Sequence, residues 1–356
     1  MASAGGRAVA DTMQTRRRHW QRNAISPGLI LLAVAVGCTP EREFVPFAAL
    51  RAENSMRRGE EKLQTQDLDS ALAEFQAAVD LNPRWAEAHS KVGQVFRLKG
   101  DYEEAAKAFR QAVRLNPLSF DDTFSLGEAY QQLKNFADAV RAYLHACELR
   151  PRDYQARLHL GVCYQEAGEL TEALESFQQA AKIDPSAPAA YTNLGAVYAA
   201  QGKYYEAIRA FNQSLERDPN QPRVLVSLGA TLLKQGRYAT ARRALEQAIE
   251  ADPTLAAAHE RLGYCCFRQR QFAEAAGYYE QAVALDPKMA EAHAGLGVSR
   301  MALYLHDPSR IELRRQAVED WHRSLELQPD QPKIRQLVER YREPEDTSDP
   351  LLAGAP

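Results

Sequence analysis

The chain has 356 residues, of which 45% are hydrophobic and 26% charged, and its formal net charge at pH 7 is −3. These values are typical of a folded protein or repeat array and exclude a wholly disordered or polytopic membrane protein. No basic block follows the N-terminal region, so electrostatics give little basis for a nucleic acid partner, and none is expected.

Residues 1–37 have the composition of a secretory signal. Several arginines lie between residues 16 and 22, every residue of Leu29–Val36 is apolar, and Gly37 and Cys38 follow. A basic flank, a short apolar centre and small residues at its end are typical of such a signal, whereas a membrane-spanning helix needs about 20 apolar residues. The alternative is a buried N-terminal helix, which the Ser-Pro-Gly sequence before the apolar run disfavours.

The sequence AVAVGC, residues 33–38, resembles a bacterial lipoprotein signal. The resemblance implies that Cys38 becomes the first residue of the mature chain and is the lipidation site, with residues 38–51 as a lipidated linker. Acyl chains anchor a protein because each buried methylene contributes about 0.8 kcal/mol. Met13 is a more conventional start than Met1. The resemblance thus implies a bacterial cell-envelope protein that faces the periplasm or the exterior, on the outer membrane in a Gram-negative cell.

The next segment, residues 52–331, contains an internal repeat. Prolines recur every 34 residues over Pro83–Pro287, and glycines and alanines recur in step over Gly59–Gly263 and Ala71–Ala275. This period and pattern resemble the tetratricopeptide repeat, a helix–turn–helix unit. The resemblance implies an all-α fold, a right-handed α-α superhelix of about eight units, in which neighbouring units stabilise one another by stacking.

The eighth unit contains an eight-residue insertion. Gly297 keeps the period, but the closing Pro329 lies 42 residues after Pro287. The extra length falls around residues 303–315, between the paired helices, where it is expected to protrude as a loop or a short extra turn. Such an insertion is either an interaction element or a tolerated change at the surface.

The C-terminal end is expected to close the array. Residues 332–342 are predicted to form a capping helix, because four apolar residues share one of its faces. Those residues are Ile334, Leu337, Val338 and Tyr341. Residues 343–356 have neither the length nor the pattern to fold, and we expect a disordered tail.

No combination of residues in the chain predicts catalysis. The histidines have no partners at metal-ligand spacing, and nucleophile elbows, Walker loops and dinucleotide-binding turns are absent from the sequence. We therefore expect no enzymatic activity, no metal, no cofactor and no small-molecule substrate. Cys147 and Cys163 form either a disulfide in an oxidising compartment or a pair of buried thiols.

The repeat resemblance implies a partner-binding groove for a protein or peptide, because the first helices of such units line a concave surface. Positions two, five, nine and twelve of each first helix face the ligand in that family. In this chain the early positions are polar and acidic, and the later ones are apolar or small. The candidate groove residues are Phe124, Glu128, Leu158, Val162, Asn193, Ala196, Val226, Ala230, Leu233, Tyr264 and Phe267.

Two specialised ligand classes of this family lack support in the sequence. The carboxylate clamp needs a set of lysine and asparagine positions that no adjacent pair of units supplies. The asparagine ladder needs asparagine at position six of successive units, and only Asn193 provides one.

Together these features predict a non-enzymatic, membrane-anchored scaffold that recruits a partner for an envelope complex. The resemblance to lipid-anchored repeat proteins implies pilus or secretion machinery, or cell-wall machinery. The alternative is a regulatory subunit of an envelope enzyme, such as a glycan or peptidoglycan hydrolase. A third hypothesis, that the chain is itself an enzyme, has no supporting constellation of residues.

Overall fold

The computed structural model describes residues 45–342, and within them the secondary structure is entirely helical. The helices are α2 (Val45–Gln64), α3 (Leu68–Leu81), α4 (Ala86–Lys99), α5 (Tyr102–Leu115), α6 (Phe120–Gln132), α7 (Phe136–Leu149), α8 (Tyr154–Glu166), α9 (Leu170–Ile183), α10 (Pro188–Ala200), α11 (Tyr204–Arg217), α12 (Pro222–Lys234), α13 (Tyr238–Ala251), α14 (Ala256–Arg268), α15 (Phe272–Leu285), α16 (Ala290–His306), α17 (Ile311–Leu327) and α18 (Pro332–Tyr341). Each helix packs against the next along the chain, so the described residues form consecutive antiparallel pairs.

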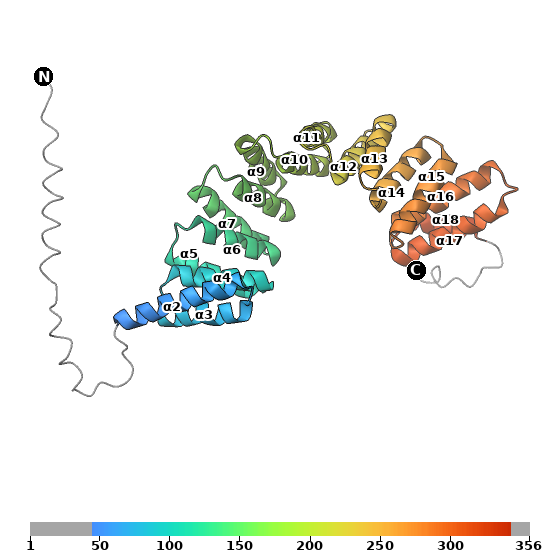
Figure 1. Cartoon of the computed structure of the whole chain (residues 1–356). Helices are drawn as coiled ribbons and strands as arrows, with labels where there is room; N and C mark the ends of the chain where they lie inside the picture. The colour runs from blue at the N-terminus through green and yellow to red at the C-terminus, as the bar shows by residue number, and fades with distance from the viewer. Residues whose placement is uncertain (1–44, 343–356) are drawn as a thin grey trace, which may run out of the picture.

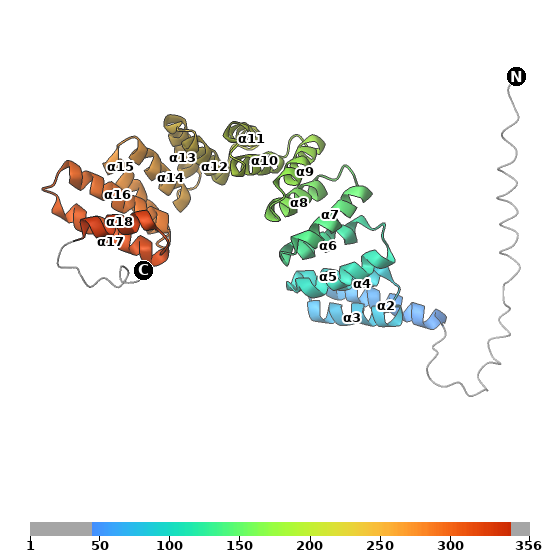
Figure 2. The same cartoon turned by 180° about the vertical axis from the view of Figure 1, so that it is seen from behind.

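The pairs stack into an arch (Figure 1). The first helices of the pairs, such as α8, α10 and α12, lie on its inner side, and the second helices lie on its outer side (Figures 1 and 2). The predicted α-α superhelix is therefore confirmed.

The recurring glycine in the first helix of each pair allows the two helices to approach closely. A Cβ atom built on Gly59 would lie 2.5 Å from Cε1 of Phe75, and one on Gly195 would lie 2.6 Å from the Phe211 ring. Real Cβ contacts do not occur at such distances, so only glycine fits beneath the ring. Phe75 and Phe211 are in turn almost completely buried, which makes each ring the centre of its unit.

The turn inside each regular pair needs one residue with a left-handed backbone. Glycine meets this requirement in four turns, at Gly100, Gly168, Gly202 and Gly236. Non-glycine residues adopt it in three others, at Gln66, Lys134 and Arg270. These seven positions follow the 34-residue period, so the turn geometry is part of the repeat even where its glycine is missing.

The array begins earlier than the sequence pattern predicts. Helix α2 starts at Val45, seven residues before the expected first unit at residue 52. Pro46 suits the first turn of a helix, where its missing N–H has no role, and Ala48, Ala49 and Leu50 continue it favourably. Phe47 and Leu50 on this extension are exposed.

The insertion in the eighth unit lengthens both helices of the last pair. Helices α16 and α17 have 17 residues each, whereas the regular pairs after α2 have helices of 13 or 14. Residues 307–310 then form a short connection. Helices α16 and α17 keep the packing face of the repeat, because the Trp321 ring lies against Gly297.

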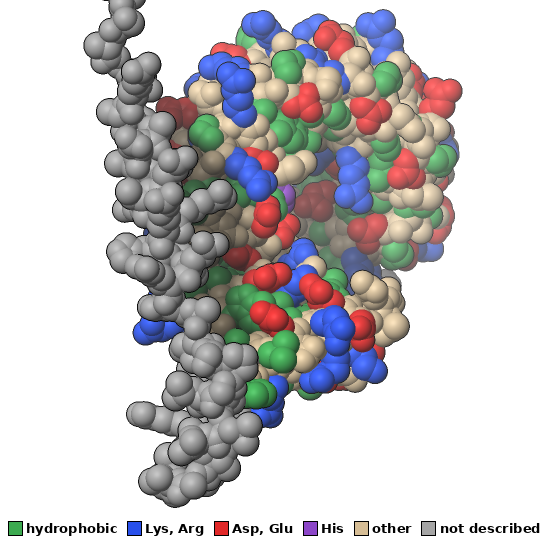
Figure 3. Space-filling model, turned by 60° about the vertical axis from the view of Figure 1, so that its left-hand side comes forward, with side chains coloured by type: hydrophobic (Ala, Val, Ile, Leu, Met, Phe, Trp, Pro, Cys, Tyr) green, Lys and Arg blue, Asp and Glu red, His purple; other side chains and the backbone are tan. Residues whose placement is uncertain are grey.

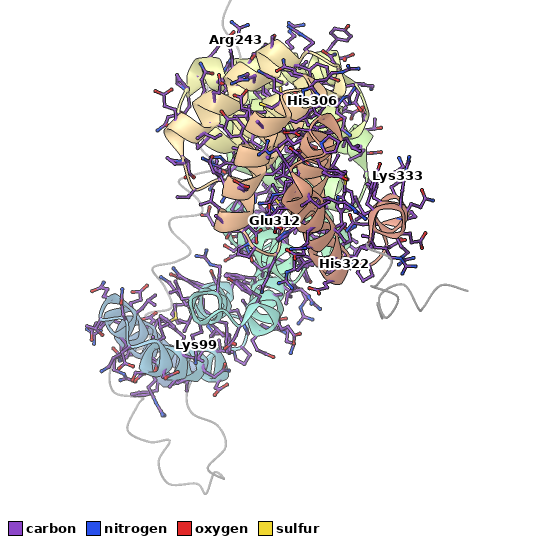
Figure 4. All side chains as sticks on the ribbon, turned by 90° about the vertical axis from the view of Figure 1, so that its right-hand side faces the viewer. Lys99, Arg243, His306, Glu312, His322 and Lys333 are labelled. Atoms are coloured by element: carbon purple, nitrogen blue, oxygen red, sulfur yellow. The ribbon has the colours of Figure 1, made fainter. Side chains whose placement is uncertain are left out.

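Helix α18 covers the end of the last pair. Val338 is completely buried in a cluster with Trp321 and Met301, and Ile334, Leu337 and Tyr341 pack against the same cluster. Figure 4 views this end of the arch, with Lys333 on α18 far from Lys99 near the other end.

Within the described residues, none of the helices is both long and apolar enough to cross a membrane. The predicted signal (residues 1–37, with the start at Met1 or Met13), the lipidation site Cys38 and the predicted tail (residues 343–356) lie outside the described residues.

Candidate functional site: the concave surface

The predicted groove residues all lie on first helices. They come from α6 (Phe124, Glu128), α8 (Leu158, Val162), α10 (Asn193, Ala196), α12 (Val226, Ala230, Leu233) and α14 (Tyr264, Phe267). Most are half-buried, Leu233 is buried in the core between units, and Tyr264 is exposed. Figure 3 shows the inside of the arch as a deep hollow, with hydrophobic, acidic and basic side chains around it.

A hollow with a volume of about 950 Å³ lies between α12 and α14. Ala230, Leu233 and Tyr264, all predicted groove residues, line it. Its edge is basic, because Lys234, Arg261 and Arg268 also line it. Arg268 is held in place by a 2.7 Å hydrogen bond that its Nη1 donates to the Tyr264 hydroxyl. This hollow combines a floor of small and apolar residues with cations at the rim.

A second, smaller hollow of about 320 Å³ lies next to it, between α14 and α16. Two predicted groove residues, Tyr264 and Phe267, line it. The other lining residues are Glu260, Tyr279, Glu291, Ala294, Gly295, Val298 and Gln331. Tyr264 and Glu260 line both hollows and thus form the ridge between them.

Glu260 is a buried carboxylate on this ridge, with only 9% of the residue exposed. Its ion-pair partner is Arg261, whose Nε lies 3.4 Å from Oε2. Burial raises the pKa of the Glu260 carboxyl above its usual value, although the charge of Arg261 opposes this shift and that of Glu291 adds to it. The ridge therefore carries an acid that is poorly solvated and weakly paired.

A cluster of polar and aromatic residues lies where α6, α7 and α8 meet. The Tyr143 hydroxyl donates a 3.0 Å hydrogen bond to Oε1 of Gln131, and Nδ1 of His159 lies 3.0 Å from the same oxygen. The Phe124 ring contacts both Tyr143 and His159 edge-on. Burial lowers the pKa of His159, so the ring is neutral near pH 7. The shared acceptor and the ring contacts give this cluster a structural role.

Charges near the N-terminal end of the groove are paired between units. Nζ of Lys91 lies 2.9 Å from Oε1 of Glu60, and Nη1 of Arg97 lies 3.4 Å from Oε2 of Glu128. The predicted groove residue Glu128 is thus engaged with the preceding unit. The acidic character expected for the early groove is partly neutralised by these bridges.

Three histidines at the fourth position of a first helix support the packing between units. Nε2 of His89, His259 and His293 lies 3.0–3.1 Å from the carbonyl of Pro83, Pro253 and Pro287, respectively. Each contact links the fourth residue of a unit to the proline before it. Within the part of the chain that the structure describes, no group of three or more His, Cys, Asp or Glu could hold a metal ion.

The four cysteines of the described residues are free and buried, so no disulfide joins Cys147 to Cys163. Burial raises the pKa of Cys163 to about 12 and that of Cys266 to about 11. The thiols therefore stay protonated near pH 7 and pack as small apolar groups.

Two residues that line the smaller hollow, Glu260 and Tyr279, are not among the predicted groove residues. Glu260 is the fifth residue of its unit, in register with Val226, so a charge among apolar groove residues was a usable signal. Tyr279 belongs to the second helix α15, whose side chains are expected in the core. It reaches the hollow because Gly295 follows on α16, where a Cβ atom would overlap the Tyr279 ring. Only the packing of the two units makes this visible.

Known proteins with related sequences and structures agree with this architecture. The family model described as the cilia and flagella-associated protein 70 C-terminal domain matches residues 47–298. The chain therefore belongs to this family of tetratricopeptide repeat domains. No curated protein matches the chain.

Solved structures share the fold at low sequence identity. One chain of the crystal structure of the APC/C hetero-tetramer Cut9-Hcn1 is 17% identical with a TM-score of 0.54; the match covers 81% of this chain and 55% of that one. A tetratricopeptide repeat protein from Parabacteroides merdae is 17% identical with a TM-score of 0.53, over 70% of this chain and 99% of that one. The pilF protein of Pseudomonas aeruginosa is 23% identical with a TM-score of 0.50, over 58% and 94% of the respective chains.

The family match defines the class of protein, and the solved structures share its fold. The chain spans about half the length of the chain that it matches in the Cut9-Hcn1 structure. It is a tetratricopeptide repeat array, a fold that serves as a scaffold for protein–protein interaction.

Proposed function

We propose that the chain is a membrane-anchored, non-enzymatic scaffold whose concave surface recruits a protein or peptide into a complex of the cell envelope. The observation that carries the proposal is the pair of adjoining hollows along α12, α14 and α16. They lie on the inner side of the arch, and Tyr264 on the ridge between them is exposed although it is a large aromatic side chain. Exposed aromatic groups in a concave site are typical anchors for a partner.

The anchor is proposed from the sequence alone. The basic stretch, the apolar run Leu29–Val36 and the Gly37–Cys38 pair support lipidation of Cys38. Helix α2 begins at Val45, so few residues would separate the acyl chains from the array. Such a tether favours assembly of a complex at the membrane, in pilus or secretion machinery or in cell-wall machinery.

A second candidate is regulation of an envelope enzyme that another chain provides, for example a glycan or peptidoglycan hydrolase. The same groove would hold a segment of that enzyme. A complex purified through this chain that shows turnover would favour regulation, and one without turnover would favour assembly.

Two experiments test the proposal. Cys38→Ser should abolish metabolic labelling with a fatty acid and release the chain from membranes; unchanged partitioning would refute the anchor. For the groove, a random peptide library displayed on phage is selected on the immobilised array. The combined variant Tyr264→Ser and Phe267→Ser, or Ala230→Trp in the larger hollow, should lose most captured peptides.

The matched control is Tyr205→Ser, which removes an aromatic side chain that is 78% exposed on the second helix α11. It should leave capture unchanged. Circular dichroism and melting curves verify that each variant is folded. If neither groove change reduces capture, the concave surface is not the binding site.

A further inference from the structure

We propose that the small hollow between α14 and α16 binds a lysine or arginine side chain of the partner segment, with Glu260 as the counter-ion. This inference rests on the proposed function and names the chemistry of its partner. The hollow is defined here as the cationic subsite.

The charges of the lining residues carry the first step. Glu260 and Glu291 line the cationic subsite, and no Lys, Arg or His of the described residues does so. Two carboxylates that face one hollow repel each other, and Glu260 has lost most of its hydration. A cation that enters the hollow would relieve both costs, whereas an anion would increase them.

The ion pair that Glu260 makes within the chain is weak, so its carboxylate can pair with a cation of the ligand. Its ion-pair partner Arg261 follows it in the sequence, and the Arg261 side chain is 48% exposed. At 3.4 Å the contact is longer than a charge-assisted hydrogen bond, which measures about 2.7–2.9 Å. A guanidinium or ammonium group in the hollow can make the shorter contact that Arg261 does not make.

The walls of the subsite suit a cation with a long aliphatic stem. Tyr264, Phe267 and Tyr279 line the same hollow as the two carboxylates. Aromatic faces attract Lys and Arg cations, and their apolar surface packs against the methylene groups of these side chains.

The hollow also depends on a departure from the repeat. Position six is Arg261 in the seventh unit but Gly295 in the eighth. A side chain at this position would collide with the Tyr279 ring, which now forms one wall of the subsite. The site is therefore specific to the last two units and is not a feature of every groove position.

The larger hollow next to it has more cations than anions, because Lys234, Arg261 and Arg268 line it beside Glu260. A partner segment that places its cation at Glu260 would place acidic groups or backbone carbonyls over α12. Residues 343–356 of this chain contain four acidic residues and no Lys or Arg, so they do not supply the cation.

The phage selection tests the inference when it is repeated on three proteins. These are the unmodified array, Glu260→Gln and the control Glu250→Gln, which removes the same charge from an exposed position on the second helix α13, outside both hollows. Glu260→Gln keeps the shape of the side chain and removes a buried charge, so its folding should be preserved; a melting curve checks this.

The unmodified array and Glu250→Gln should both enrich peptides with one Lys or Arg position, and Glu260→Gln should lose this preference. A selected peptide is then synthesised with a fluorescent label and with arginine or its neutral analogue citrulline at that position. Citrulline should weaken binding to the unmodified array by about tenfold or more and change binding to Glu260→Gln much less, because a neutral group cannot pair with the carboxylate.

The failures are distinguishable. Groove-dependent peptides without a basic preference, or a preference that Glu260→Gln leaves intact, would overturn the cationic subsite while the proposed function stands. Peptides whose capture ignores the Tyr264, Phe267 and Ala230 changes, or no captured peptides at all, would overturn the proposed function and the inference with it.

Discussion

The guanidinium of Arg314 on α17 donates a hydrogen bond from Nε to the backbone carbonyl of Tyr341, the last residue of α18, at 3.0 Å. Its Nη2 donates a second one to the carbonyl of Arg342 at 3.1 Å. The carbonyls at the end of a helix have no partners within the helix and carry its negative dipole end, so a cation there stabilises α18. Arg314 belongs to the region of the insertion, which therefore supports the cap of the array.

We expect Arg314→Met to lower the stability of the C-terminal end by about 1–3 kcal/mol, because two hydrogen bonds to a charged donor are lost. Hydrogen exchange measures this loss. The amides of α18 should exchange faster in Arg314→Met than in the unmodified chain, whereas those of α10 should not change. Arg315→Met is the control, since the Arg315 side chain is 60% exposed and pairs with Glu312 on its own helix. Equal exchange in both variants would refute the role of Arg314.

The contact between Gly195 and Phe211 predicts a loss of stability on adding a single methyl group. Gly195→Ala should cost about 1–3 kcal/mol, because the new Cβ overlaps a ring that is itself buried. Gly277→Ala on α15 should instead stabilise the chain by about 0.5–1 kcal/mol, since its Cβ meets nothing within 4 Å and alanine favours the helix. Urea denaturation measures both, and equal effects would contradict the packing scheme.

The turn at Lys134 predicts a gain of stability. Lys134 has φ 56°, whereas the matching residues in four other units are glycines. Lys134→Gly should raise the melting temperature through a gain of up to about 1 kcal/mol, because glycine adopts this backbone without a Cβ clash. The reverse change Gly202→Ala, at φ 73° and with open space around it, should lower the melting temperature. The turn geometry is refuted if the two changes shift stability in the same direction.

Asp320 on α17 predicts a pH dependence. Burial raises the pKa of its carboxyl to about 6, although Arg300, with Nη1 at 2.7 Å from Oδ2, opposes the shift. Because the folded-state pKa lies above the unfolded value of 3.8, the native state binds more protons between these values. Its contribution to stability therefore falls as pH rises from about 4 to 6, by up to roughly 2–3 kcal/mol.

The measurement compares the free energy of unfolding of the unmodified chain and Asp320→Asn at several pH values from 4 to 8. The difference between the two proteins isolates Asp320 from the other carboxylates. As pH rises to about 6, the unmodified chain should lose stability relative to Asp320→Asn. Above pH 7 the difference in free energy of unfolding between the two proteins should stay constant. A difference that does not change with pH would show that Asp320 has an ordinary pKa.

Much of the fold could be predicted from the sequence because each feature is local or repeats. Within one helix pair, Gly195 packs against Phe211 sixteen residues later, so this contact follows from the local sequence. The 34-residue period repeats the same kind of contact along the chain. The start of α2 at Val45 was missed because the first seven residues have no counterpart in the period. The sequence placed the insertion between the paired helices but did not predict that it lengthens α16 and α17. The contact between Arg314 and Tyr341 joins residues 27 apart and depends on the fold.

The sequence by itself determined the class of architecture, the side of each helix that packs and the stripe from which the groove is built, since these depend on helical spacing within one unit. The tertiary structure decided what surrounds each groove residue: Leu233 packs between units at the wall of the larger hollow, Glu128 pairs with Arg97, and Glu260 meets Glu291 and Tyr279 in the smaller hollow. The physical reason is that burial and charge pairing depend on which side chains face each other across the unit boundary, and the stacking of units sets that geometry.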